Sequence, residues 1–182
     1  YRMGKMDKRK DRRNFSGGTT LIGKEEFCSQ VRLCEESMYR LAYSIMRNDA
    51  DAGEVVSEAV FRAYKNLDGF KNTASFKTWI LRIVHNTAVE TVRKNSRNIL
   101  TEEFEETSLG KQEEDTALKL TLREAVESLK QPYRTAVILF YYENLSAAKI
   151  AKITGTSGAA VKQQLSRSRK MLRELLKEDF EA

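Results

Sequence analysis

Apolar residues recur every three or four positions along most of the chain, the spacing that places them on one face of an α-helix. In the first half this pattern predicts three amphipathic helices, at about 24–47, 51–66 and 73–95. The faces expected to turn toward a core contain Phe27, Val31, Cys34, Met38, Leu41, Ala42 and Ile45; Val55, Val56, Ala59, Val60 and Ala63; and Phe76, Ile80, Ile83, Val84 and Val89.

Polar residues between these segments supply the expected helix ends. Asp49 or Asp51 can cap the second helix, and Thr73 or Ser75 the third, because their side-chain oxygens can accept from free backbone N–H groups. The Asp-Gly pair at 68–69 predicts a turn between the two helices.

The second half carries four more helical segments. A stripe over 115–130 is followed by a helix over 132–144, whose first turn suits Pro132. Ser146 can then cap a short helix over 147–154, and a turn around Gly155 leads into a longer final helix from about residue 157. A short helix, a three-residue turn and a longer helix are typical of a helix-turn-helix, whose second helix enters the DNA major groove. We therefore expect an all-α fold of two small helical domains.

The final helix has two contrasting faces. Val161, Leu165 and Leu172 share the apolar face, which should dock onto the preceding helices. The polar face is basic, with side chains suited to phosphates at Lys162, Arg167, Arg169 and Lys170 and amides that can pair with base edges at Gln163 and Gln164. A packed helical hairpin with an ordinary charged face is the alternative.

Charge is unevenly distributed. The net charge is +6, which favours a polyanionic partner. Residues 101–118 hold seven acids and one base, so that stretch is −6 and the rest of the chain is +12. The chain is therefore expected to consist of basic lobes around an acidic linker.

The sequence lacks the residues expected of a membrane protein, a metal-binding protein or an enzyme. The sequence shows no apolar run that would span a bilayer and no signal peptide, so we expect a cytoplasmic protein without membrane insertion. Cys28 and Cys34 are six positions apart and point to different sides of a helix, as expected of free thiols in a reducing compartment. His85 is the only histidine, and no clustered carboxylates suggest a catalytic site. We expect no metal, no cofactor, no small-molecule substrate and no enzymatic activity.

Residues 1–23 form a separate segment at the start of the chain. The first twenty residues have seven Lys or Arg against two Asp and no helical period, as expected of a flexible basic arm. Weak attraction to nucleic acid and a solvated tail without a role are both open. Because the arm begins with Tyr1 and not with Met, residues from outside the natural chain are one alternative for its origin.

The third predicted helix interleaves aromatic and basic side chains. Phe76 and Trp79 lie among Lys77 and Arg82, a mixture suited to single-stranded nucleic acid because bases stack on rings while cations follow the backbone. Trp79 can equally be a core anchor, and the residues alone leave both readings open.

Two long segments together carry a resemblance to a known family. They are "LAYSIMRNDADAGEVVSEAVFRAYKNLDGFKNTASFKTWILRIVHNTA" and "YRTAVILFYYENLSAAKIAKITGTSGAAVKQQLSRSRKMLRELL". In this order and around an acidic linker, they resemble regions two and four of the extracytoplasmic-function (ECF) sigma factors, which start transcription in bacteria. The resemblance covers 27–95 and 115–176, and it implies region two (24–95) and region four (115–182), with the acidic linker (96–114) between them and the basic arm (1–23) before them.

The resemblance implies roles for particular residues. Those corresponding to the docking segment for the clamp of core RNA polymerase are Asp51, Glu54, Val55, Glu58 and Phe61. Those corresponding to the part that melts and holds the minus-ten promoter element are Asn72, Phe76, Lys77, Trp79, Arg82 and Asn86. Those corresponding to the reader of the minus-thirty-five element are Ser157, Lys162, Gln163, Gln164, Arg167 and Arg169. The family also implies an anti-sigma factor as a partner.

The sequence departs from the family pattern at several places. The clamp segment has Gly53, which costs a helix about 1 kcal/mol relative to Ala. Ala147, Ala148 and Lys149 stand where acids are usual, and Gln163-Gln164 replaces a usual Ser-Arg pair. The promoter sequence that this chain reads therefore does not follow from the family.

Two other function classes compete with a sigma factor. A stand-alone helix-turn-helix regulator would explain the second lobe but not the aromatic and basic helix or the acidic linker. Such regulators usually dimerise on paired half-sites, and the sequence has no heptad seam. A nuclease would need clustered carboxylates in fixed geometry, and the concentrated acids lie in the linker.

Overall fold

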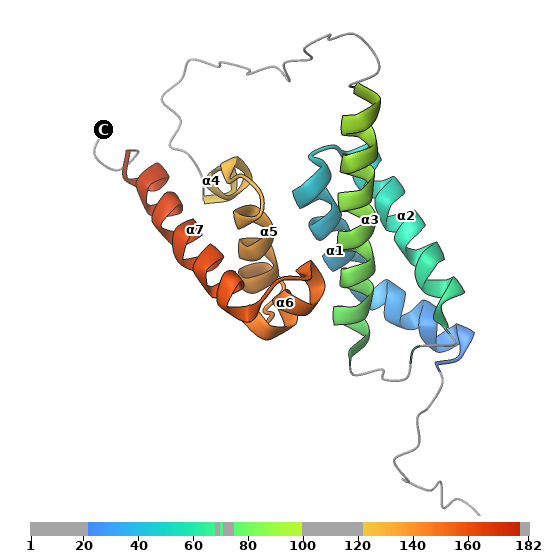
Figure 1. The fold of residues 1–182 in the computed structure, drawn as a ribbon. Coiled ribbons are helices and arrows are strands. Elements are labelled where there is room, and N and C mark those ends of the chain that lie inside the picture. Colours follow the sequence, from blue (N-terminus) through green and yellow to red (C-terminus); the bar gives the residue numbers. More distant parts are fainter. Residues whose placement is uncertain (1–21, 68–69, 71–74, 100–121, 179–182) are drawn as a thin grey trace, which may run out of the picture.

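The computed structural model describes residues 22–67, 70, 75–99 and 122–178. This described part is helical and contains no strand, which confirms the predicted all-α class. Its helices are α1 (Lys24–Met46), α2 (Asp49–Lys65), α3 (Phe76–Ile99), α4 (Leu122–Ser128), α5 (Tyr133–Val137), η3 (Ile138–Tyr142), α6 (Ala147–Thr154) and α7 (Gly158–Glu178). Figure 1 shows that they form an N-terminal unit, α1–α3, beside a C-terminal unit, α4–α7.

The N-terminal unit is a three-helix bundle in which each helix contacts the other two. Small residues of α2, such as Ala52, Ala59 and Ala63, are fully buried and allow close approach of the helices. Asn48, and not Asp49 or Asp51, caps α2, because its side-chain oxygen accepts from the N–H of Asp51 at 3.1 Å. The predicted cap was therefore wrong by one residue.

The C-terminal unit contains the predicted helix-turn-helix. The Ser146 hydroxyl caps α6 by accepting from the N–H of Lys149, and Ser157 caps α7 by accepting from the N–H of Ala160 at 3.1 Å. Between them Gly155 has a φ of 69°, a left-handed conformation that ends α6 and that other residues rarely adopt. Val161 and Leu165 are buried, so the apolar face of α7 docks onto the unit as predicted.

Three of the predicted helices differ from the sequence-based expectation. α3 continues to Ile99, four residues beyond the predicted end, and α4 begins at Leu122, with 115–121 outside the described residues. The predicted helix over 132–144 divides into α5 and the π-helix η3, in which Glu143 N–H donates to the Ile138 carbonyl at 3.1 Å. Such wide turns are rare and often functional. At the end of this turn the side chain of Glu143 is buried.

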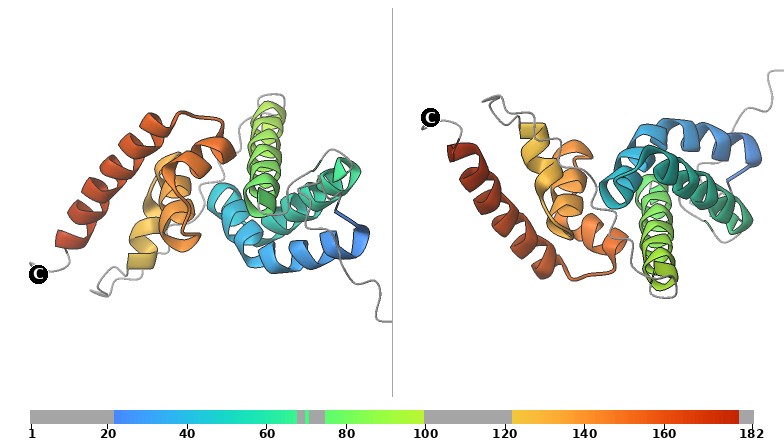
Figure 2. Two further views of the ribbon diagram at one scale, coloured as in Figure 1. Left: turned by 90° about the horizontal axis from the view of Figure 1, so that it is seen from below. Right: turned by 90° about the horizontal axis from the view of Figure 1, so that it is seen from above.

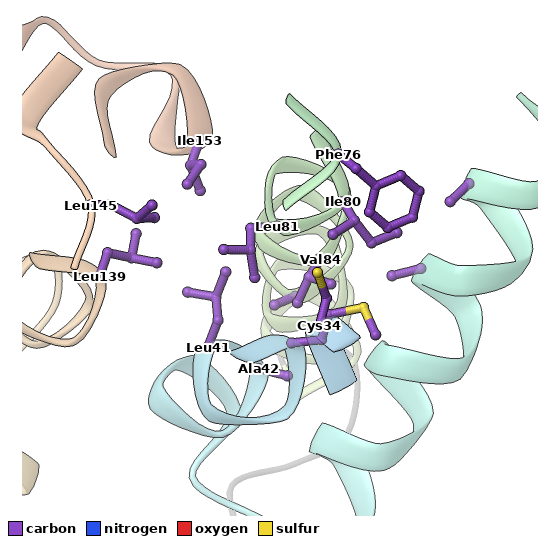
Figure 3. Packing of buried hydrophobic residues seen from close by; sticks show 14 of the residues in the cluster. Cys34, Leu41, Ala42, Phe76, Ile80, Leu81, Val84, Leu139, Leu145 and Ile153 are labelled. Carbon is purple, nitrogen blue, oxygen red and sulfur yellow. The ribbon is translucent and has the colours of Figure 1, made fainter. Parts of the chain in front are cut away.

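One hydrophobic core extends across both units. Leu41 of α1 and Leu81 of α3 point toward Leu139, Leu145 and Ile153 of the C-terminal unit (Figure 3). All five are buried, and α6 packs along α3 in both views of Figure 2. A second, smaller cluster around Val126, Leu129, Val137 and Ile138 belongs to the C-terminal unit alone. Helical periodicity predicted the two units but not this shared core.

We expect opposite effects of alanine at two glycines. An added Cβ at Gly53 meets nothing within 4 Å, so Gly53→Ala should raise the free energy of unfolding by about 0.5–1 kcal/mol through higher helix propensity. At Gly155 the space is also open but φ is positive, so Gly155→Ala should lower it by about 1 kcal/mol. Urea unfolding followed by circular dichroism measures both, and effects of the same sign would contradict this account.

Candidate nucleic-acid interface

The outward face of α7 is polar and basic. Lys162, Gln163, Arg167 and Arg169 are exposed, while Gln164 is half-buried. On the inward side of the same helix, the buried Ser168 hydroxyl donates to the Gln164 carbonyl at 2.7 Å. The helix therefore presents four long polar side chains to solvent.

Acids contribute little to that face. Within the described part of α7, the one ion pair joins Lys170 Nζ to Glu174 Oε1 at 3.9 Å, toward the C-terminal half of the helix. Lys162, Arg167 and Arg169 have no carboxylate within ion-pair distance there. The positive charge is thus available to an external anion.

The first turns of α3 are built on an aromatic cluster. Trp79 stacks on Phe70 with ring centroids 4.4 Å apart, and Phe76 meets the edge of Trp79 at 5.5 Å. Phe76 is 1% exposed, so its ring cannot reach a base and instead supports Trp79, which is half-buried. Phe76 therefore lies on the core face that its periodicity predicted, and Trp79 packs against the core, which was one of the two readings of that residue.

The polar residues predicted to bind DNA near this cluster differ in their exposure to solvent. Arg82 and Asn86 are exposed, Lys77 is half-buried, and Asn72 lies outside the described residues.

Burial lowers the pKa of His85, although a hydrogen bond with Asn86 opposes the shift, so the imidazole is neutral at pH 7. Among the described residues, no group of three or more His, Cys, Asp or Glu can hold a metal ion. Among the described helices, none has the length and apolar character to cross a membrane.

An acidic groove lies between α2 and α3. Asp51, Glu54 and Glu58 line it from α2, and Glu90, which the sequence-based prediction missed, lines it from α3. Arg62 bridges the helices through 2.7 Å contacts with Glu58 Oε1 and Glu90 Oε2, and these hydrogen bonds raise its pKa. Phe61 is exposed, whereas Val55 lines the groove but is only 2% exposed, because most of its side chain packs in the core.

Glu143 lies at the centre of a polar cluster between the two units. Its side chain is 2% exposed, and its carboxylate accepts hydrogen bonds from Ser37 and Arg40 of α1. The ammonium of Lys77 on α3 lies 2.8 Å from Oε2 of the same carboxylate. We call these four residues the Glu143 cluster.

The cluster determines the ionisation of its carboxylate. Burial by itself would raise the pKa of Glu143, but hydrogen bonds from Lys77, Ser37 and Arg40 and the charge of Lys77 lower it below its ordinary value. Glu143 is therefore ionised at neutral pH. No sequence pattern marked it, because it follows an apolar run as a single acid and its partners are about 66 to 106 positions away.

A second polar contact joins the units near the end of α1. Arg134 is 9% exposed and donates to the backbone carbonyls of Ser44 and Glu127, each at 2.8 Å. Gln131 also donates to the Ser44 carbonyl, at 2.7 Å. Burial, together with the charge of nearby Arg47, lowers the pKa of Arg134. The Ser44 carbonyl near the end of α1 is thus satisfied by the C-terminal unit.

Comparisons with known proteins find relatives that match both units of the chain. Residues 31–98 match the family described as Sigma-70 region 2, and residues 119–172 match Sigma-70, region 4. The chain is 33% identical over 147 residues to RNA polymerase sigma factor SigV of Bacillus subtilis, covering 80% of this chain and 89% of that protein. It is 28% identical over 169 residues to ECF RNA polymerase sigma factor SigW of the same organism, covering 85% and 90%.

A solved structure is similar in fold as well as sequence. It is the sigma factor RpoE from Bartonella quintana in complex with the anti-sigma factor NepR. The TM-score is 0.70 at 25% identity, and the match covers 84% of this chain and 98% of that one.

We predict that the contribution of Glu143 to stability disappears in acid. Because its pKa is lower in the folded chain than in the unfolded chain, the stabilisation is complete above the unfolded value, near 4.3. It is lost as the pH falls through the folded pKa. Glu143→Gln should lower the free energy of unfolding by about 2 kcal/mol at pH 7, the range for hydrogen bonds to charged groups.

Urea unfolding of both proteins between pH 7 and pH 3 measures this difference. It should stay constant down to about pH 5 and then shrink. Glu36→Gln is the control, because Glu36 pairs with Arg40 within α1 and its side chain is 85% exposed. A difference between wild type and Glu143→Gln that stays constant to pH 3 would contradict the assignment.

Proposed function

The chain belongs to the extracytoplasmic-function sigma factors, and we propose on that premise that it directs core RNA polymerase to promoters through two separate DNA-reading helices. The observation that carries the proposal is the occurrence, in one chain, of an aromatic and basic α3 and a basic helix-turn-helix helix α7. Sigma factors are non-enzymatic subunits of transcription initiation, and similarity along both units favours this function over a stand-alone regulator.

We assign α7 to the minus-thirty-five element. Exposed Lys162, Arg167 and Arg169 would contact phosphates, which give affinity without sequence information. Gln163 and Gln164 would contact base edges, since a glutamine amide can pair with adenine through two hydrogen bonds. Ser157 would lie close to the phosphate backbone at the start of the helix.

We assign the start of α3 and the residues before it to the minus-ten element. Arg82, Asn86 and Lys77 would contact the separated strand, as would Asn72 outside the described part. Trp79 would offer the accessible part of its ring to an unstacked base while the rings of Phe70 and Phe76 hold it in place.

We assign the acidic face of α2 to the clamp of core RNA polymerase. Asp51, Glu54, Glu58 and Phe61 remain in this assignment, and Glu90 joins them across the groove. A basic partner surface with an apolar centre would be complementary to this face.

The remaining assignments follow from the family. We divide the chain into an arm (1–23), region two (24–95), a linker (96–114) and region four (115–182), with the arm and the linker almost wholly outside the described residues. The similarity to RpoE in its complex with NepR supports an anti-sigma factor as a partner. Because RNA polymerase works in the cytoplasm, we place the chain there.

The experiment that tests the function uses core RNA polymerase from Bacillus subtilis. We expect the full chain to co-elute with the core enzyme and to start transcripts from members of a DNA pool with randomised minus-thirty-five and minus-ten blocks. Tight binding of the chain alone to duplex DNA, without association with the core enzyme, would instead indicate a stand-alone regulator.

The double variant Gln163→Ala, Gln164→Ala separates the two roles. It should change the minus-thirty-five sequences selected from the pool, with a loss of about 1–3 kcal/mol for each base contact, and leave co-elution unchanged. Both residues lie away from the acidic face of α2. Equal loss of core association and of promoter use would refute the assignment of α7.

A paired substitution on α3 separates strand contact from folding. Arg82→Ala should reduce heparin-resistant promoter complexes several-fold without lowering the melting temperature, because Arg82 is exposed. Trp79→Ala should reduce the complexes and lower stability by about 3 kcal/mol, because it removes a ring from the aromatic cluster. Unchanged complexes in the Arg82 variant would remove it from the minus-ten site.

A further inference from the structure

A cavity of about 400 Å³ lies between the second half of α1 and the helices α4, α5 and η3. Its volume is within the range of small-molecule sites, about 300–1,000 Å³. None of the residues that line it is among those assigned above to promoter DNA or to core RNA polymerase. The proposed function therefore leaves this cavity without a role.

The cavity has a buried base and an exposed rim. Val126 and Ile138 give the base an apolar surface, and the buried residue Arg134 adds a positive charge to it. At the rim, Tyr39 and Tyr142 are 38% and 49% exposed. An apolar pocket with a few convergent polar groups is the usual form of a ligand site.

The charge of the cavity is positive and only partly compensated. Four arginines and two glutamates line it, which gives its walls a net charge of +2. Arg40 pairs with Glu36, and Arg123 pairs with the carboxylate of Glu127 at 3.0 Å. The other two arginines have no such partner, because no carboxylate of the described residues lies within ion-pair distance of them.

These two guanidiniums, of Arg47 and Arg134, converge on a single acceptor. Both donate to the backbone carbonyl of Glu127, Arg134 at 2.8 Å. Burial and the charge of Arg47 both lower the pKa of Arg134, so the two cations are close enough to repel one another. An anion bound beside both would remove this repulsion, and the planar guanidinium matches the oxygens of a phosphate group.

Three tyrosine rings supply flat apolar surface beside these cations. Tyr39 and Tyr43 are nearly parallel, with ring centroids 6.3 Å apart and an interplanar angle of 22°. The hydroxyl of Tyr39 donates to Asp49, which does not line the cavity and which holds the ring in place. Tyr142 adds a third ring from η3, with Arg40 5.7 Å from its centroid. Aromatic rings stack on nucleobases, whereas a bare anion gains nothing from them.

We propose that this cavity binds a nucleoside phosphate, with its base against the tyrosine rings and its phosphate beside Arg47 and Arg134. Inorganic phosphate would use only the arginines, and an uncharged nucleoside would use only the rings. The proposal goes beyond the function proposed above and does not depend on it, because none of these contacts involves DNA or polymerase.

Isothermal titration calorimetry with the full chain tests the proposal. The probes are ADP, GDP, inorganic phosphate and adenosine, in about 0.15 M salt to screen unspecific attraction between a basic protein and anions. We expect ADP or GDP to bind at one site per chain. Its affinity should be at least tenfold higher than the affinities of inorganic phosphate and adenosine, since each of these makes only one kind of contact.

Two pairs of variants locate the site. Arg47→Gln should weaken nucleotide binding at least tenfold, because it removes charge-assisted hydrogen bonds to the phosphate. Arg32→Gln is its control, since Arg32 is exposed on the same helix and does not line the cavity. Tyr142→Leu should weaken nucleotide binding several-fold and leave the affinity for inorganic phosphate unchanged. Its control is Tyr141→Leu, which removes a neighbouring ring of similar exposure, 51%, from outside the cavity.

Three results would overturn the proposal: no binding of either nucleotide at millimolar concentration, inorganic phosphate binding as tightly as the nucleotides, or equal losses in Arg47→Gln and Arg32→Gln. Far-ultraviolet circular dichroism verifies that each variant is folded. If Arg47→Gln does not fold, the comparison of Tyr142→Leu with Tyr141→Leu decides, and equal affinities of these two variants for the nucleotide would then overturn the site.

Discussion

The buried carboxylate of Glu143 is the contact on which the relative placement of the two units depends. Apolar surfaces attract one another without much directionality, so Leu41 and Leu81 alone would tolerate several registers against the C-terminal unit. Glu143 is satisfied only where Ser37, Arg40 and Lys77 converge, and that condition selects one register. The π-helix η3 contributes by placing this side chain at the interface directly after a run of apolar residues.

Under the proposed function, packing and binding share the same helices. On α7 the two tasks are separated by face, with Val161, Leu165 and Ser168 inside and the basic residues outside. On α3 they meet in Trp79, which stacks on Phe70 and still has an accessible part. Under the proposed function, recognition by Trp79 depends on the integrity of the core, whereas the exposed side chains of α7 serve recognition without contributing to stability.

Prediction from the sequence succeeded where the determinants are local. The Ser146 cap of α6 and the turn around Gly155 depend on a few neighbouring residues, and both were predicted. It failed by one residue at Asn48, where three polar side chains compete for the same cap. Periodicity placed Phe76 and Val55 on the core faces, where the structure buries them, whereas the resemblance to the family gave both residues external roles.

The sequence by itself determined the all-helical fold, the two units, the helix-turn-helix and the basic face of α7, since periodicity, capping and charge act over a few turns of one helix. Only the tertiary structure decided that the units share a core, that Lys77 is paired, and that Glu90 joins the acidic groove. These depend on residues far apart in the chain, up to 106 positions for Ser37 and Glu143. Nothing in the local pattern around either residue records that distant contact.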